Sequence, residues 1–221
     1  MDSTPHPDDD PLDAEASLAL IRDQQEHVRA TREPDARLIF GAWAISWLVG
    51  FLLLWKSSTR TGALWTQPTA AAYGVFAALM AASVAFSIVH TVRRSAGTRG
   101  PSARVGALYG WSWTIGFLAM TLIMNGLSRA GASDQMLALA ANALVCVIVG
   151  LLYLAGALVF GETSMYALGV WILVVAGAAT IVGLPTSNLV MALAGGGGFL
   201  IMAVAAHVRL VRRRRRATTG A

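Results

Sequence analysis

Long apolar runs and short polar stretches alternate along the chain. Six runs can be distinguished, and each is close to the ~20 residues that an α-helix needs to cross a hydrocarbon layer ~30 Å thick. The pattern therefore predicts an all-α fold, a polytopic membrane helix bundle of six transmembrane helices. The predicted spans are Leu38 to Trp55, Ala70 to Val92, Val105 to Leu127, Met136 to Phe160, Met165 to Leu184 and Leu189 to Leu210.

The connections between these runs contain the glycine, proline, serine or asparagine residues that end helices. The last two, Gly161 to Ser164 and Gly183 to Asn188, are very short. We therefore expect the fourth, fifth and sixth spans to be antiparallel neighbours. The earlier connections are Lys56 to Arg60, Arg93 to Pro101 and Ser128 to Asp134.

Basic residues predict the orientation, because loops that are rich in Lys and Arg stay in the cytoplasm. With the N-terminus inside, 14 of the 17 Lys and Arg residues fall on the inner side, and Lys56, Arg60 and Arg129 fall outside. A five-span chain would place the C-terminal arginine run outside. We expect a multi-pass protein of the cell (plasma) membrane with both termini in the cytoplasm.

This topology divides the chain into an N-terminal tail over residues 1–37, a transmembrane domain over 38–210 and a basic tail over 211–221. The acidic, polar N-terminus predicts no signal peptide, so the first span should be retained as an anchor. Within the tail, Pro11 to Arg32 predicts a helix that Pro34 ends. Its narrow apolar face favours the cytoplasmic membrane surface, and a solvated helix is the alternative.

Composition supports a membrane protein and narrows its chemistry. Hydrophobic residues make up 56% of the chain and charged residues 13%, about half the charge of an ordinary soluble domain. The single cysteine, Cys146, excludes an intrachain disulfide and a multi-cysteine metal site. The central parts of the spans contain no Asp, Glu, Lys or Arg, which argues against proton-coupled pumps, cation antiporters and voltage sensors. We expect no cofactor, no bound metal and no enzymatic activity.

An internal repeat is visible in the spans. Ser46 to Phe51 matches Ser112 to Phe117, and Trp171 lies at a similar depth in the fifth span. The second and sixth spans end similarly, at His90 and His207, each followed by arginine. The pattern indicates three helical hairpins in the same orientation.

Tryptophan usually lies at membrane interfaces, but Trp47 and Trp113 are predicted near the middle of their spans. Each follows a serine, Ser46 or Ser112. Two such rings could narrow a water-filled path, with Trp171 as a third candidate; alternatively, they pack against neighbouring helices.

Asn125 and Asn142 are expected near the outer ends of adjoining spans, where their amides could meet across the hairpin. Interhelical hydrogen bonding is the simpler interpretation, and contact with a solute is the alternative. The sixth span carries Gly195, Gly196, Gly197 and Gly198. Close packing against a neighbouring helix, or an interrupted helix that exposes carbonyls to a cavity, would explain this run.

His90 and His207 are predicted at the inner ends of their helices, where a cation complements the helix dipole, so a structural role accounts for their position. A pH-sensing pair is the alternative. The C-terminal arginines are positioned to hold anionic lipid headgroups, and as a topology signal they suggest no nucleic-acid partner. These residues are Arg212, Arg213, Arg214, Arg215 and Arg216.

The predicted architecture has three hairpins in the same orientation, aromatic residues in mid-span, and neutral polar residues without buried charge. This architecture resembles that of the six-span urea/amide channels and the acetate/succinate transporters. The Gly41-Ala-Trp43 start of the first span, Gly169-Val-Trp171 and the glycine run also resemble uncharacterised six-span membrane proteins of high-GC Gram-positive bacteria, some of them labelled transporter. The first resemblance implies a channel or facilitator for a small neutral or weakly acidic solute; the second supports the six-span fold and carries no assigned chemistry. The other hypotheses are the membrane subunit of an ABC-type exporter and a non-transporting anchor or signalling partner. The lipid bilayer is the expected surrounding, with a homo-oligomer as a possible assembly.

Overall fold

The computed structural model describes residues 17–21, 35–58, 66–95 and 101–219, and every regular element in these ranges is helical. Six helices are long and apolar enough to cross a membrane, which confirms the predicted fold class. They are α2 (Ala36–Ser58), α3 (Ala70–Ser95), α4 (Pro101–Arg129), α5 (Asp134–Phe160), α6 (Thr163–Val182) and a composite helix. The composite helix consists of α7 (Thr186–Val190), a π-helical segment η1 (Met191–Gly196) and α8 (Gly197–Thr219).

Residues 17–21 are helical and belong to the predicted N-terminal helix. The remainder of that helix and its predicted contact with the membrane surface lie outside the described residues. The C-terminal arginine run lies on the last turns of α8, which continues to Thr219.

The helix ends follow from local chemistry. Before α5, the Ser133 side chain accepts a hydrogen bond from the Met136 backbone N–H at 3.3 Å and so caps the helix. Gly161 ends α5 in the left-handed conformation at φ 70°, which glycine adopts without steric cost. Gly183, at φ 69°, ends α6 at Val182, slightly before the predicted end of the span.

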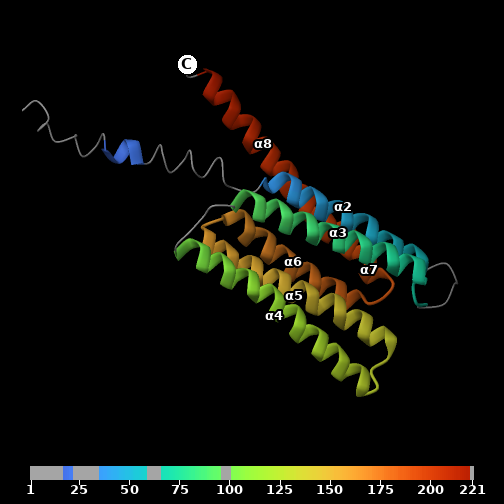
Figure 1. Cartoon of the computed structure of the whole chain (residues 1–221). Helices are drawn as coiled ribbons and strands as arrows, with labels where there is room; N and C mark the ends of the chain where they lie inside the picture. The colour runs from blue at the N-terminus through green and yellow to red at the C-terminus, as the bar shows by residue number, and fades with distance from the viewer. Residues whose placement is uncertain (1–16, 22–34, 59–65, 96–100, 220–221) are drawn as a thin grey trace, which may run out of the picture.

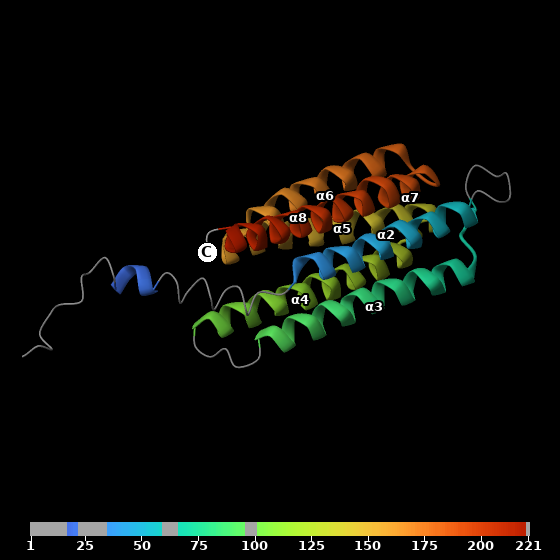
Figure 2. The same ribbon diagram turned by 90° about the horizontal axis from the view of Figure 1, so that it is seen from above.

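The six spans pack in a defined spatial order. In order of contact, the spans run α3, α2, the composite helix, α6, α5 and α4, and each contacts the next. α2 contacts all three parts of the composite helix, α7, η1 and α8. α3 and α4 lie at the two ends of this order of contacts, although they follow each other in sequence. Figures 1 and 2 show the bundle from two directions. Of the six spans, α3 and α4 are the least buried.

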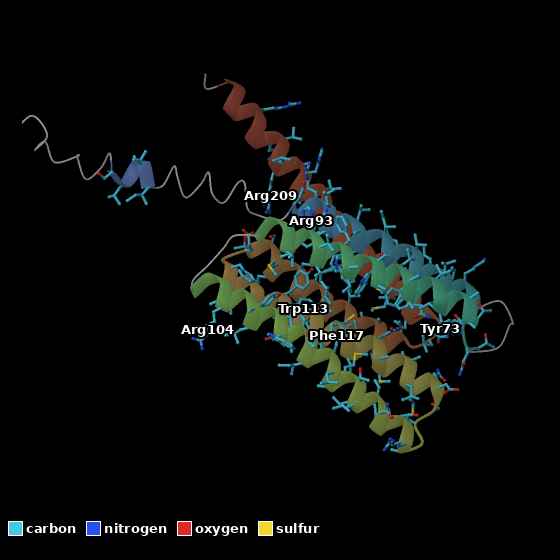
Figure 3. The ribbon with its side chains drawn as sticks, in the orientation of Figure 1. Tyr73, Arg93, Arg104, Trp113, Phe117 and Arg209 are labelled. Atoms are coloured by element: carbon cyan, nitrogen blue, oxygen red, sulfur yellow. The ribbon has the colours of Figure 1, made fainter. Side chains whose placement is uncertain are left out.

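Because consecutive spans run in opposite directions, the basic residues at the end of α3, the start of α4 and in α8 lie at the same end of the bundle. Figure 3 shows Arg93, Arg104 and Arg209 at this end and Tyr73 at the other. The start of α2, with Arg37, lies there as well, because Arg37 contacts His207 of α8. We call this the basic end.

The most extensive helix contact joins α5 and α6. A β-carbon on Gly150 would lie 3.1 Å from the Gly169 carbonyl oxygen, and one on Gly169 would lie 2.8 Å from the Gly150 oxygen. The two backbones therefore approach through paired glycines, as small residues allow in membrane bundles. The buried core lies between this pair, α2 and the composite helix, and includes Phe51, Leu168, Ile172, Met191 and Phe199.

Candidate functional site

Two tryptophans flank the glycine run of the composite helix. A β-carbon on Gly195 would lie 2.5 Å from Cε3 and Cζ3 of Trp47 in α2, and one on Gly198 would lie 2.5 Å from Cδ1 of Trp171 in α6. Both rings thus occupy the volume that a side chain at these glycines would need. At Gly195 and Gly198, the glycine run is therefore explained by close packing against neighbouring helices.

Gly196 and Gly197 differ from each other. A β-carbon on Gly196 would lie 2.9 Å from the Leu48 backbone nitrogen, whereas nothing lies within 4 Å of one on Gly197. The run therefore packs at Gly195, Gly196 and Gly198 but is open at Gly197.

The helix is not interrupted at this run; instead, it widens into the π-helical turn η1. The Trp171 indole N–H donates a hydrogen bond at 2.9 Å to the carbonyl oxygen of Ala194 within that turn. π-helical turns are rare and frequently lie at functional sites.

Aromatic rings close the basic side of this turn. Phe199 of α8 is 1% exposed and lies against Trp47 in an edge contact with ring centroids 5.3 Å apart. Trp43 stacks on the same phenylalanine, with centroids 6.2 Å apart. The rings of Phe199, Trp43 and Trp47 therefore pack together on the side of η1 that faces the basic end.

Neutral polar groups line the opposite side of the turn. The Asn142 amide of α5 donates to the Asn188 side-chain oxygen of α7 at 3.3 Å. One turn deeper, Cys146 Sγ lies 3.9 Å from Met191 Sδ, and both residues are buried. Ser187, beside Asn188, is 1% exposed.

Two buried polar side-chain atoms in the described part of the chain have no hydrogen-bond partner: Trp47 Nε1 and Ser187 Oγ. A buried polar group without a partner is rare and costly, about 1–3 kcal/mol, so each one calls for a reason. Ser187 belongs to α7, and Trp47 packs on η1, the segment that follows α7. Ser187 and Gly195, the residue that the Trp47 ring meets, lie on either side of Met191 in the composite helix.

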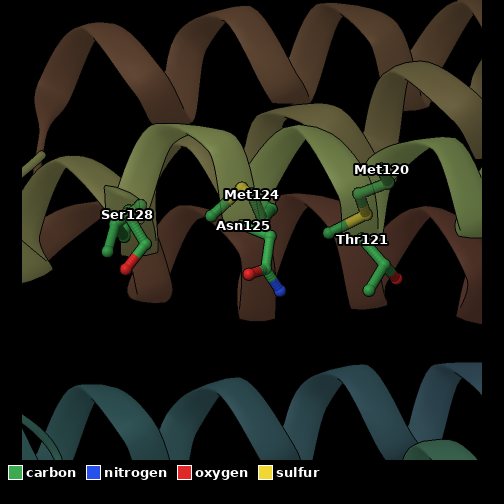
Figure 4. Close-up of a pocket in the computed structure, with 6 residues that line it drawn as sticks. Met120, Thr121, Met124, Asn125 and Ser128 are labelled. Atoms are coloured by element: carbon green, nitrogen blue, oxygen red, sulfur yellow. The ribbon is translucent and has the colours of Figure 1, made fainter. Parts of the chain in front are cut away.

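The predicted meeting of Asn125 with Asn142 is wrong, because Asn142 pairs with Asn188 instead. Asn125 is exposed on α4 and lines a shallow depression of about 370 Å³ with Met120, Thr121, Met124, Ser128 and Leu137. Figure 4 shows the Asn125 and Thr121 side chains projecting from the same side of α4. The sequence placed both asparagines at one membrane depth, but it could not show which helix faces which.

Trp113 packs against the margin of the same buried core as Trp47, but it contacts different aromatic rings. Trp113 packs edge-on against Tyr153 of α5, with ring centroids 6.1 Å apart. Its neighbour Ser112 is exposed and donates to the Leu108 carbonyl of its own helix at 3.0 Å. The sequence match between the two spans therefore does not give equivalent environments.

Ser46, the serine before Trp47, is a structural contact. Its hydroxyl lies 2.7 Å from the Ser83 hydroxyl and 3.1 Å from the Leu79 carbonyl of α3. The seam between α2 and α3 is thus held by interhelical hydrogen bonds, the simpler interpretation of the neutral polar residues.

Sequence reasoning missed Ser187 and Asn188, because they were assigned to the connection before the sixth span. Pro185, Thr186 and Ser187 are the residue types that begin helices, and this signal would have extended the span to include them. It also missed Phe199 as the closing ring.

In the described ranges, no group of three or more His, Cys, Asp or Glu side chains lies close enough to hold a metal ion.

The fold defines the chain as a multi-pass integral membrane protein, since six of its helices can cross a membrane. A comparison with protein-family models, with curated proteins and with solved structures finds no match to this chain.

Proposed function

We propose that this protein is a facilitator for a small, neutral, hydrogen-bonding solute, with the passage running along α7 and η1. The observation that carries the proposal is the pair of unpartnered buried polar atoms, Trp47 Nε1 and Ser187 Oγ. A donor and a hydroxyl that lack partners in the closed state can both be satisfied by a solute that moves along the helix.

The chemistry of the lining favours a neutral solute. Asn142, Asn188, Ser187 and the Trp47 indole offer hydrogen bonds without net charge. An ion would lose its hydration shell here and meet no opposite charge, which is strongly unfavourable in a low-dielectric interior. Urea, amides and the protonated form of a weak acid such as acetic acid match this lining.

The described conformation is the closed one, because Trp47 and Phe199 fill the core beyond η1. Passage requires these rings to separate from the glycine run. The π-helical turn and the glycines at 195–198 supply the freedom for that movement.

The basic end is proposed to face the cytoplasm of a cell whose plasma membrane holds the protein, as the distribution of Lys and Arg indicates. In that orientation Arg212 and Arg215, which are exposed on α8, would reach anionic lipid headgroups. The Asn142–Asn188 pair would then lie towards the outer side and form the entrance.

A homo-oligomer is proposed as the working assembly. α4 carries Thr114, Thr121, Asn125 and Ser128, all exposed on the surface of the single chain. Polar and small residues in a membrane favour contact with another helix over lipid. A second copy of the chain would cover this surface.

The proposal is tested by solute uptake into reconstituted vesicles, measured as light scattering after rapid mixing with urea, acetamide or glycerol. Vesicles with the protein are expected to take up at least one solute faster than empty vesicles do. Ser187→Ala should slow that uptake, whereas Ser112→Ala, which removes an exposed hydroxyl, should leave it unchanged. Equal rates with and without protein for all the solutes would favour the anchor hypothesis instead.

A further inference from the structure

Three helices meet at the basic end through a cluster of ionisable residues. The Asp35 backbone N–H, just before α2, donates to His90 Nε2 of α3 at 2.9 Å. Arg37 of α2 lies with Nη1 3.3 Å from His207 Nδ1 of α8. The Arg37 guanidinium also binds the Asp35 carboxylate through two hydrogen bonds of 2.9 and 2.5 Å.

Both histidines are hydrogen-bond acceptors in these contacts. A backbone amide and a guanidinium can only donate, so His90 Nε2 and His207 Nδ1 must each carry a lone pair. A protonated imidazole has an N–H on both nitrogens and accepts nothing. Protonation of either ring is therefore incompatible with the contact that the ring makes.

The surrounding charges offer a protonated ring little compensation. The Asp35 carboxylate, just before α2, is already hydrogen-bonded to the Arg37 guanidinium and is not free to pair with a protonated imidazole. Arg93 follows His90 on α3 and Arg209 follows His207 on α8, both at this end of the bundle (Figure 3). α6, which also packs on α8, contributes only Glu162 before its first turn.

The His90 ring is also fixed in place. Phe86, one turn earlier on α3, stacks on it with ring centroids 5.6 Å apart and planes at 19°. The ring therefore cannot turn away from Asp35 without losing this stacking.

We propose that His90 and His207 form a proton-sensitive clamp, which holds the start of α2 against α3 and α8 while both imidazoles are neutral and releases it when they are protonated. Histidine is the residue that most often supplies such a proton-sensitive contact in proteins. The proposal does not depend on whether a solute crosses the protein.

Hydrogen–deuterium exchange of the full chain in lipid nanodiscs tests the clamp. After correction for the intrinsic effect of pH, the peptide that covers residues 35–43 should exchange about ten-fold faster at pH 5.5 than at pH 8, the scale expected from losing two hydrogen bonds. A peptide from the middle of α5 should not change and serves as the control for overall folding.

His90→Gln with His207→Asn supplies the matched variant, because each amide oxygen can accept the same hydrogen bond but does not titrate. This double variant should keep residues 35–43 protected at both pH values. The proposal is overturned if the wild-type peptide exchanges equally at pH 8 and pH 5.5, or if the double variant keeps the wild-type response. The first of these results is decisive even if the variant does not fold.

Discussion

Trp47 and Gly195 are in contact so close that the indole occupies the place of a side chain. A β-carbon on Gly195 would lie 2.5 Å from two ring carbons of Trp47. This contact joins α2 to the π-helical turn η1, and it connects the packing of the core to the proposed movement of the composite helix.

Gly195→Ala should lower the stability of the protein by about 1–3 kcal/mol, since the added methyl group forces Trp47 or the helix to shift. Gly197→Ala is the matched control. Its methyl group meets no atom within 4 Å, and replacing glycine in a helix should stabilise by about 0.5–1 kcal/mol. Thermal unfolding in detergent measures both changes. Equal effects of the two substitutions would contradict the described register of the glycine run.

Trp171→Phe should keep most of the ring packing but remove the hydrogen bond from the indole to the Ala194 carbonyl. The expected loss is about 0.5–1.5 kcal/mol, the net value of one such bond. Trp111→Phe, at a tryptophan that is 64% exposed, should change the unfolding temperature much less. A loss of the same size in both variants would mean that the hydrogen bond contributes nothing.

Asn142 and Asn188 should be energetically coupled, and Asn142 and Asn125 should not. A double-mutant cycle with alanine at the first pair is expected to give a coupling energy of about 0.6 kcal/mol, with about 1.7 as the upper end. The cycle with Asn125→Ala provides the control and should give a value close to zero. Coupling confined to the Asn125 pair would restore the arrangement expected from the sequence.

Asp35→Asn should weaken the basic end at neutral pH. The hydrogen bond from the Arg37 side chain lowers the pKa of Asp35 below its ordinary value of 3.8, so the carboxylate stabilises the fold above that pH. This contribution is lost as the pH falls through the lowered pKa. The difference in unfolding temperature between wild type and Asp35→Asn should therefore be present at pH 7 and shrink below pH 4. A difference that is the same at both pH values would contradict the ion pair.

The six spans could be predicted from the sequence because span length and the residues that end helices are local properties. Ser133 and Gly161, for example, act within one turn of the helix ends that they form. The neutral, uncharged character of the interior is likewise visible in the order of residues, without knowledge of which helices touch.

The partners across helices could not be predicted. Asn142 has two candidate partners at similar depth, Asn125 and Asn188, and only the rotation of α4 and α7 about their axes decides between them. Trp47 and Trp113 have the same local sequence, yet α2 lies in the interior of the bundle and α4 at its edge. The π-helical turn accepts a hydrogen bond from Trp171 of another span, a contact that local sequence does not reveal.

The most direct test of the proposed passage compares two tryptophan variants in reconstituted vesicles. Trp47→Phe should relax size selection, so that the uptake of glycerol rises relative to that of urea, because a smaller ring replaces the indole that closes η1. Trp113→Phe, at a ring on α4 that packs against Tyr153 of α5 and not against η1, should keep the wild-type ratio. The account is contradicted if wild-type vesicles take up both solutes no faster than empty vesicles, or if the two variants change the ratio equally.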